Sequence, residues 1–464
     1  MRQILLLAIL LSGGQALAQQ SSVGDLERRA VERRAVEAVI WGMPAVNYDV
    51  MRQEMIRKTA ARENEVLYWS RPADWKNQTL TPNPDAIYLM IFFNTKDGPV
   101  VIDVPPADKG SFAANIDDVW QMPLADAGPE GSDAGKGGKY LVLPPNYKGE
   151  VPQGYFALRS LTFGGFALFR SNLASHSEAD IAKSRDYGKR LKVYPLSRAG
   201  NPGTTKFTDA KDVIFDSTIP FDAGFFRSLD RVVQAEPWLA RDMAMIDQLK
   251  SIGIEKGKPF TPDAKTVEIL NAAASEARQL LDRRYEALGP FFPGRQWTTP
   301  ATPAFKDAIQ TGYADVNSYP VDARGLIYTV GFVGIKRLGT AQFYLINFRD
   351  NAGSPFAGGK TYRLHVPADI PAKQYWSVTV YDRETHALVR NLNRASLASN
   401  DTGVQKNADG SVDVYFGPKA PAGQESNWVP TDPKRPFELL LRLYGPQKAL
   451  FEKTWAMPDV EQMK

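Results

Sequence analysis

Ala86–Val104 reads AIYLMIFFNTKDGPVVIDV. Two runs of apolar, β-branched and aromatic residues flank Lys96-Asp97-Gly98, a turn signal that is typical of a β-hairpin. We therefore expect strands at 86–95 and 99–104 that pair with each other. Three further runs have the same character and are expected to extend this sheet system: Ser111–Trp120, Lys139–Leu143 and Phe163–Arg170.

Helical patterns lie on both sides of these strands. Apolar residues recur at roughly helical spacing over Asp25–Ile40, and Gly42 with Pro44 is expected to end that helix before a second one runs to about Lys58. The helical pattern returns between about 176 and 290. It is most regular over 261–288, where a proline follows the first residue and Gly289-Pro290 ends the pattern.

Beyond about residue 325 the pattern is again that of strands, at Ala341–Phe348, Thr361–Val366, Tyr375–Asp382, Ser411–Phe416 and Phe437–Tyr444. Strands, then helices, then strands predict a mainly β chain with α additions, in which a helical section joins two β domains. The predicted boundaries are a signal peptide at 1–18, a helical N-terminal arm at 19–75, an N-terminal β domain at 76–222, a helical connector at 223–324 and a C-terminal β domain at 325–464.

The first 18 residues, MRQILLLAILLSGGQALA, have the three parts of a secretory signal peptide. Arg2 precedes an apolar run over Ile4–Leu11, and Ala16-Leu17-Ala18 is a small-residue cleavage site. The run is far shorter than the roughly 20 residues that span a bilayer, so no stable membrane insertion is expected. The sequence predicts an exported protein, periplasmic or secreted.

Composition excludes several classes of protein. The 464 residues include no cysteine, which excludes disulfides, a thiol nucleophile and thiolate metal sites. The formal net charge of +4 is too small over this length for a nucleic-acid-binding surface. The GxSxG and SxxK signatures of serine hydrolases and the HExxH signature of zinc proteases do not occur. GSPFAGGKT, at 353–361, has the wrong spacing for a phosphate loop, and no cofactor is predicted.

Long stretches of the chain resemble two bacterial domain families. TPNPDAIY at Thr81–Tyr88 and GPVVIDVP at Gly98–Pro105 resemble domain of unknown function 1254. Its usual C-terminal companion, domain of unknown function 1214, is similar to 361–382, 405–421, 426–430 and 441–446. The resemblance implies two β-sandwich, jelly-roll-like domains with helical additions. It implies no activity that can be transferred residue by residue.

Polar residues among aromatic ones form the candidate sites. Two carboxylates in an apolar setting can act as an acid/base pair on a glycan, because burial raises a carboxyl pKa. The candidate catalytic residues are Asp85 with Asp117 or Asp118. The candidate ligand-binding residues are Asn83, Tyr88 and Trp120 in the N-terminal part, and Tyr381, Asp382, Asn391, Arg394, Asn427, Trp428, Arg442 and Tyr444 in the C-terminal part.

The histidines offer a weaker candidate. His365 and His386 could meet across adjacent strands and bind a metal with Asp382 or Glu384, although exposed or hydrogen-bonded histidines on a sheet are the more ordinary interpretation.

A structural interpretation of the polar sets competes with the functional one. In it, short polar side chains cap turns, tryptophans fill cores, and Asp382 forms a buried ion pair with Arg442. Three hypotheses therefore stand. The chain binds a small organic or saccharide ligand or assembles with itself; it is a hydrolase or lyase acting on an ester or glycan; or it binds a metal through histidine and carboxylate.

Overall fold

The computed structural model describes residues 22–463, so the predicted signal peptide lies outside the described residues. β3 (Ala86–Asn94) runs through the middle of the larger N-terminal sheet, and all but its last side chain are buried. Side chains alternate between the two faces of a strand. Ile87, Leu89 and Ile91 enter one apolar cluster, while Tyr88 and Met90 enter another on the opposite face.

The N-terminal β region consists of two larger sheets and a short strand pair. The first sheet has the order β11-β1-β3-β9-β5-β6 and the second the order β10-β4-β7-β8. Side chains of both sheets share one buried cluster. The bounds are β1 (Val66–Tyr68), β4 (Val100–Val104), β5 (Phe112–Asp118), β6 (Pro123–Ala127), β7 (Gly138–Leu143), β8 (Tyr155–Arg159), β9 (Gly164–Asn172), β10 (Lys192–Pro195) and β11 (Phe207–Asp209), with β2 (Asn77–Gln78) paired to β12 (Phe215–Asp216).

The predicted hairpin of 86–95 with 99–104 is wrong, although both strands exist. β3 pairs with β1 and β9, whereas β4 pairs with β7 and β10 in the other sheet. The turn between them therefore carries the chain from one sheet to the next. β3 is an interior strand whose buried backbone N–H and C=O groups need a hydrogen-bonded neighbour at each edge, and β1 and β9 take those places.

The C-terminal region is also built from two sheets with a shared apolar cluster. Their strand orders are β13-β19-β15-β16 and β18-β17-β14-β20. The five strands predicted here are confirmed within a few residues. The bounds are β13 (Gln342–Asn347), β14 (Tyr362–Val366), β15 (Ala372–Asp382), β16 (Ser396–Ala398), β17 (Val412–Gly417), β18 (Trp428–Pro430), β19 (Phe437–Pro446) and β20 (Glu461–Gln462). The chain is thus mainly β with α additions, as predicted, while the jelly-roll detail stays a prediction.

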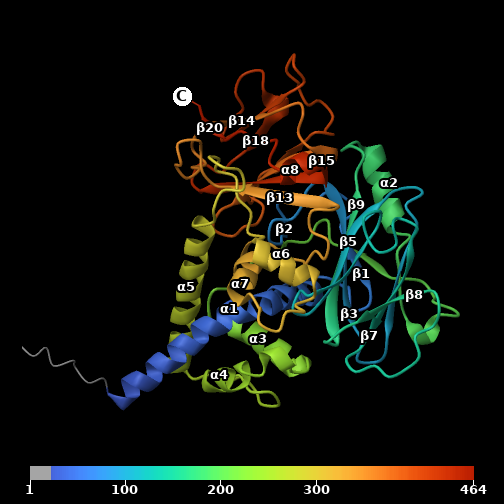
Figure 1. Cartoon of the computed structure of the whole chain (residues 1–464), viewed down its shortest axis with the longest axis vertical. Coiled ribbons are helices and arrows are strands. Elements are labelled where there is room, and N and C mark those ends of the chain that lie inside the picture. Colours follow the sequence, from blue (N-terminus) through green and yellow to red (C-terminus); the bar gives the residue numbers. More distant parts are fainter. Residues whose placement is uncertain (1–21, 464) are drawn as a thin grey trace, which may run out of the picture.

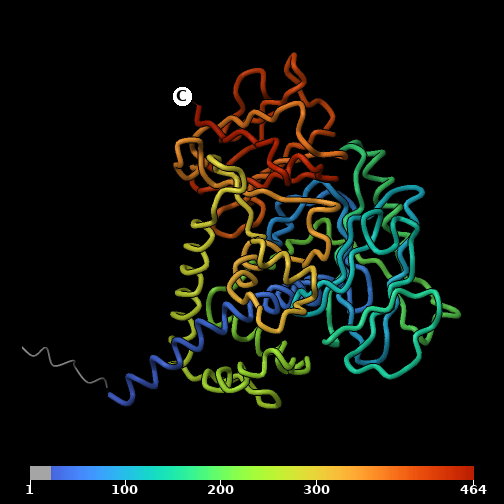
Figure 2. Tube along the Cα trace, in the orientation of Figure 1, coloured from blue at the N-terminus to red at the C-terminus, as the bar shows by residue number. Residues whose placement is uncertain are grey.

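α1 and α3 to α7 form the third part of the molecule, beside the N-terminal sheets and below the C-terminal ones, whereas α2 packs on the N-terminal sheet and α8 lies in the C-terminal region (Figure 1). No helix within residues 22–463 is long and apolar enough to cross a membrane. The segment that contains α6 and α7 lies between the two β regions (Figure 2). The helices are α1 (Val23–Lys58), α2 (Glu178–Gly188), α3 (Ala223–Ala235), α4 (Met245–Ser251), α5 (Ala264–Glu286), α6 (Pro303–Gln310), α7 (Val321–Val330) and α8 (Lys448–Phe451), with short 3-10 turns at Leu196–Arg198, Ala240–Asp242 and Glu425–Asn427.

α1 is one continuous helix, so the predicted break at Gly42 and Pro44 is wrong. Nearly all residues of its middle part are buried, on every side of the helix, against α3, α5 and α7. A helix that is apolar all round is stabilised by the packing around it. This burial outweighs the cost of an internal proline, about 3 kcal/mol.

Gly325 on α7 allows that packing. Pro44 has no N–H to donate to the Ile40 carbonyl, and α7 crosses α1 at this point. A Cβ atom on Gly325 would lie 2.9 Å from both the carbonyl oxygen and Cγ2 of Ile40. Any side chain at position 325 would therefore push the two helices apart.

We predict that Gly325→Ala lowers the free energy of unfolding by about 1–3 kcal/mol, the usual cost of overpacking a core. Gly331→Ala is the matched control, because a Cβ atom there meets its nearest neighbour at 3.6 Å, an ordinary contact. Urea denaturation of both variants measures the difference. Equal stability of the two variants would contradict this account of the helix crossing.

Candidate functional site

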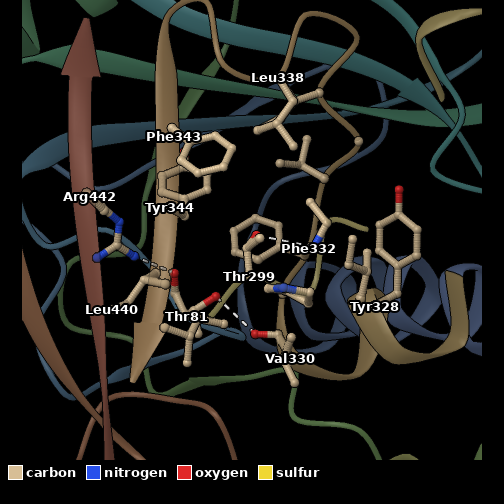
Figure 3. Close-up of a pocket in the computed structure, with 18 of the residues that line it drawn as sticks. Thr81, Thr299, Tyr328, Val330, Phe332, Leu338, Phe343, Tyr344, Leu440 and Arg442 are labelled. Carbon is tan, nitrogen blue, oxygen red and sulfur yellow. Dashed lines mark hydrogen bonds between the residues drawn. The ribbon is translucent and has the colours of Figure 1, made fainter. Parts of the chain in front are cut away.

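A cavity of ≈130 Å³ lies where the two β regions and the segment between them meet. The N-terminal sheet contributes Tyr88 and Arg170, and the C-terminal sheet contributes Tyr344 and Arg442. Residues 299–338, which include α6 and α7, supply most of the remaining wall. Figure 3 shows Arg442 and Tyr344 on one side of this space and Tyr328 on the other.

Strand register explains why an arginine and a tyrosine come from each sheet. Arg170 on β9 lies directly opposite Tyr88 on β3, and Arg442 on β19 lies directly opposite Tyr344 on β13. Residues directly opposite each other in an antiparallel pair point to the same face. The two sheets therefore each present one Arg–Tyr pair to the boundary between the domains.

Both guanidinium groups are buried without a carboxylate partner. Arg170 is 4% exposed and Arg442 is 2% exposed. Within residues 22–463, no carboxylate oxygen lies within 4.0 Å of either group. The predicted ion pair of Asp382 with Arg442 is wrong, because Asp382, the last residue of β15, pairs with Arg435, whereas Arg442 lies opposite Ser377 in the middle of that strand.

Arg442 holds the loop that precedes β3. Its Nη2 donates to the carbonyl oxygen of Thr81 at 2.8 Å and to the hydroxyl of Tyr381 at 2.6 Å, while Nη1 donates to Thr379 at 2.8 Å. The Tyr381 hydroxyl in turn donates to the carbonyl of Pro82. These hydrogen bonds satisfy some of the N–H donors of the Arg442 guanidinium and join the two β regions.

The tyrosines around the arginines do not neutralise them. Tyr88, Tyr344 and Tyr444 neighbour both guanidinium groups. Burial raises the pKa of the Tyr344 and Tyr444 phenols, so both stay uncharged at neutral pH. Two positive charges thus face a mainly apolar cavity.

A second cluster lies at the surface of the same domain boundary. His176 is placed between two carboxylates, with Nδ1 2.5 Å from Asp401 and Nε2 3.5 Å from Asp85. Ser396 donates to Asp85 at 2.7 Å, and Arg394 lies 3.9 Å from Asp401. Partial burial opposes the charged imidazole, but the contacts with Asp401 and Asp85 raise the pKa of His176 to about 10. Burial likewise opposes the charged form of Asp85, yet the contact with His176 outweighs it and lowers the pKa of that carboxyl.

Asn83 connects the two clusters. Its side-chain oxygen accepts from the N–H of Asp85 at 3.0 Å, and its amide donates to the Tyr444 hydroxyl at 2.8 Å. Its own backbone N–H donates to the hydroxyl of Tyr88 at 2.6 Å. The predicted residues Asn83, Tyr88, Arg442 and Tyr444 therefore do gather in one place.

The structure does not bring the candidate catalytic carboxylates together. Ala86, next to Asp85, is opposite Asn172 on β9, whereas Asp117 is opposite Phe166. Six residues of strand separate these positions by about 20 Å. Asp117 accepts the N–H of Gly334 at 2.7 Å in the cavity wall, and burial raises its pKa well above the ordinary value.

The other predicted residues have local structural partners. The Asp118 carboxylate accepts hydrogen bonds from the backbone N–H groups of Trp120 and Met122 in a turn. Trp120 packs against Trp41, with ring centroids 4.6 Å apart. Asn427 bonds the backbone of Gln405 and Asp413, and the Trp428 indole donates to Gly417. Asn391 is exposed, with a positive φ of 62°.

His365 and His386 do not meet. His365 pairs with Asp413 at 2.8 Å and His386 with Glu438 at 2.7 Å. Among the residues that the structure describes, no group of three or more His, Asp or Glu side chains is arranged to hold a metal ion.

Sequence reasoning missed Arg170, Tyr344 and His176. A charged residue at the end of an apolar strand, FGGFALFR at 163–170, is a signal that could have identified Arg170. Burial of a charge is costly, so a charge in such a strand often marks a site. Nothing in the local sequence indicates that His176 lies between Asp85 and Asp401.

We predict that His176→Asn lowers the free energy of unfolding by about 1–3 kcal/mol at pH 6. The folded-state pKa of about 10 lies above the unfolded value of about 6.5, so His176 stabilises the fold below pH 6.5 and loses this effect as the pH rises towards 10. The stability difference between variant and wild type should therefore shrink from pH 6 to pH 10.

The control is His365→Asn, whose more exposed ion pair should contribute less than about 1 kcal/mol. Chemical denaturation at several pH values measures all three proteins. A difference for His176→Asn that does not depend on pH would contradict the assignment of a charged imidazole.

Comparison with known proteins identifies both β regions. Residues 63–195 match the family model described as protein of unknown function DUF1254, and residues 341–448 match DUF1214. The fold is similar to that of the VPA0106 protein from Vibrio parahaemolyticus, with a TM-score of 0.58 and 18% identity over 94% of this chain and 100% of that one. An uncharacterised protein from Burkholderia cenocepacia has a TM-score of 0.40 and 12% identity, over 94% and 95% of the two chains.

No curated protein matches the chain in sequence. Both domain models are found in the predicted order, and together they cover most of the two β regions. The chain therefore belongs to the family of proteins that join an N-terminal DUF1254 domain to a C-terminal DUF1214 domain.

Proposed function

We propose that this chain is a binding protein for a small organic molecule with an apolar body, which occupies the cavity between the two β regions. The observation that carries the proposal is a partly enclosed space of ≈130 Å³ to which three separate parts of the chain contribute. Ligand sites in proteins concentrate at domain interfaces and combine mostly apolar walls with a few placed polar groups. This cavity has both properties.

The size and wall of the cavity limit its ligand. Phe305, Ile309, Phe332, Leu338 and Leu440 contribute to the wall. An apolar cavity of about 150 Å³ admits benzene. The cavity therefore suits a body of about one aromatic ring or a short alkyl chain. A saccharide needs many polar partners and suits this wall less well.

The hydrolase hypothesis has less support. It required Asp85 to act with Asp117 or Asp118, and by strand register both of these lie about 20 Å or more from Asp85. Asp85 is instead engaged with His176 and Ser396. Binding without chemistry is the function that the geometry supports best.

Cavity filling tests the proposed site. Ala301 lies half-buried at the cavity wall, whereas Ala304 is exposed on α6. We predict that Ala301→Phe abolishes the rise in melting temperature that benzene or toluene causes in the wild type, because the new ring occupies the space. A ligand at 100 times its Kd stabilises by about 2.7 kcal/mol, which a thermal scan detects.

Ala304→Phe is the matched control and should keep the full ligand effect. No thermal shift with any probe in the wild type would contradict the proposed function. An equal shift in wild type and Ala301→Phe would place binding elsewhere in the molecule.

We also propose that the protein acts outside the cytoplasm, on the basis of its first 18 residues. Residues 1–30 fused to alkaline phosphatase, an enzyme that becomes active only after export, should give active enzyme in bacterial cells. Changing Leu6 and Leu7 to Arg interrupts the apolar run and should remove that activity. An inactive unmodified fusion that is nevertheless well expressed would contradict export.

A further inference from the structure

We propose that the ligand is an organic carboxylate, whose carboxylate group lies between Arg170 and Arg442 while its apolar body lies against residues 299–338. This inference rests on the proposed function, because it names the class of molecule that the cavity takes. It follows from the charge, the hydrogen-bonding capacity and the size of the cavity.

The charge balance around the cavity favours an anion. Moving an unpaired charge out of water is unfavourable unless a partner of opposite sign is present. Arg170 and Arg442 are both buried, and no carboxylate of the described residues lies within 4.0 Å of them. A bound carboxylate would supply the missing negative charge.

Asp117 does not take this role. It is the acidic group on β5 that interacts with Arg170, but its Oδ2 is engaged with Gly334 and burial favours its protonated form. In the surface cluster, His176 and Arg394 together offset the charges of Asp85 and Asp401. The two guanidinium charges at the cavity are thus left for a ligand.

Each arginine keeps unused N–H donors. Arg170 donates through Nη1 to Asn115 at 2.9 Å and to the Ala113 carbonyl at 3.5 Å. Arg170 also interacts with the side chain of Tyr88. Apart from that contact, neither its Nε nor its Nη2 has an acceptor within hydrogen-bond geometry among the described residues, and the same holds for Nε of Arg442. A guanidinium has five N–H donors, so unsatisfied donors remain on both groups. Carboxylate oxygens accept from guanidinium forks in pairs.

Cavity size separates a carboxylate from larger anions. The space of ≈130 Å³ has to hold both the apolar body and the charged group. A carboxylate is planar, carries one charge and adds three heavy atoms, whereas a phosphonate is tetrahedral and bulkier. This volume is slightly smaller than that of a closed cavity that admits benzene, but the space is only partly enclosed. One aromatic ring with one carboxylate, as in benzoate, is therefore the upper limit of the expected ligand size.

The test compares four probes that share one ring: benzoate, benzamide, benzenephosphonate and toluene. Isothermal titration of the purified chain at pH 7 gives each Kd. We expect benzoate to bind about 10–100-fold more tightly than benzamide, the gain typical of charge-assisted hydrogen bonds. Toluene should bind weakly, and benzenephosphonate should bind less tightly than benzoate.

Arg170→Met and Arg170→Lys test the charge directly. Arg170 forms hydrogen bonds only with residues of its own sheet, whereas Arg442 also holds the loop at Thr81. A substitution at position 170 is therefore expected to disturb the fold less than one at position 442. Arg170→Met should weaken benzoate binding at least 10-fold and leave toluene binding unchanged, which also shows that the variant is folded. Arg170→Lys should restore part of the benzoate affinity. Arg159→Met, at an exposed position on β8, is the control for overall charge.

The possible failures are distinguishable. Equal binding of benzoate and benzamide, or of benzoate by wild type and Arg170→Met, would overturn the carboxylate assignment and leave the proposed function standing. Tighter binding of benzenephosphonate than of benzoate would replace carboxylate by another anion class and overturn the inference. No binding of any probe, toluene included, would overturn both the inference and the proposed function.

Discussion

The loop from Thr81 to Asp85 joins the two β regions, and the rest of the site depends on how it is held. Arg442 binds the carbonyl of Thr81, Tyr444 accepts from Asn83, and Ser396 donates to Asp85. Thr81 has a positive φ of 38°, an unfavourable conformation for a threonine. Its N–H and hydroxyl donate to the carbonyls of His386 and Val330, so contacts from two other parts of the chain fix this conformation.

This loop leads directly into β3 and therefore sets the position of Tyr88. Because Arg170 on β9 lies directly opposite Tyr88, the loop sets the position of Arg170 as well. The same hydrogen bonds that join the domains thus place two guanidinium groups at one cavity. A protein selected for stability alone would gain from apolar side chains at these positions, because buried charges without partners are costly. Retaining them is consistent with a ligand that completes the charge balance.

Periodicity in the sequence was sufficient to predict most elements. Strands such as β13, β14 and β19 have β-rich runs bounded by turn residues, and α5 has a regular apolar stripe with a capping residue before it. The pairing of strands was not predictable in the same way. Lys96-Asp97-Gly98 is a genuine turn, but whether it joins strands of one sheet or of two depends on neighbours far away in the chain.

The site was only partly predictable for the same reason. Asn83, Tyr88 and Arg442 were identified because polar residues among aromatic ones, near strand ends and turns, are conspicuous. Asp85 and Asp117 have the same local character, yet their positions along β9 separate them. Arg170 and His176 act through partners at least 55 residues away in the sequence, so only the folded chain shows their environment.

The most direct test of the account is a crystal structure of the protein with 4-bromobenzoate, located by the anomalous signal of bromine. The account predicts one strong bromine peak inside the cavity, near Phe305 and Ile309, with the carboxylate oxygens within hydrogen-bond distance of Arg170 and Arg442. A cavity without bound ligand, at a concentration that saturates binding in solution, would contradict it. So would a molecule bound with its carboxylate directed away from both arginines.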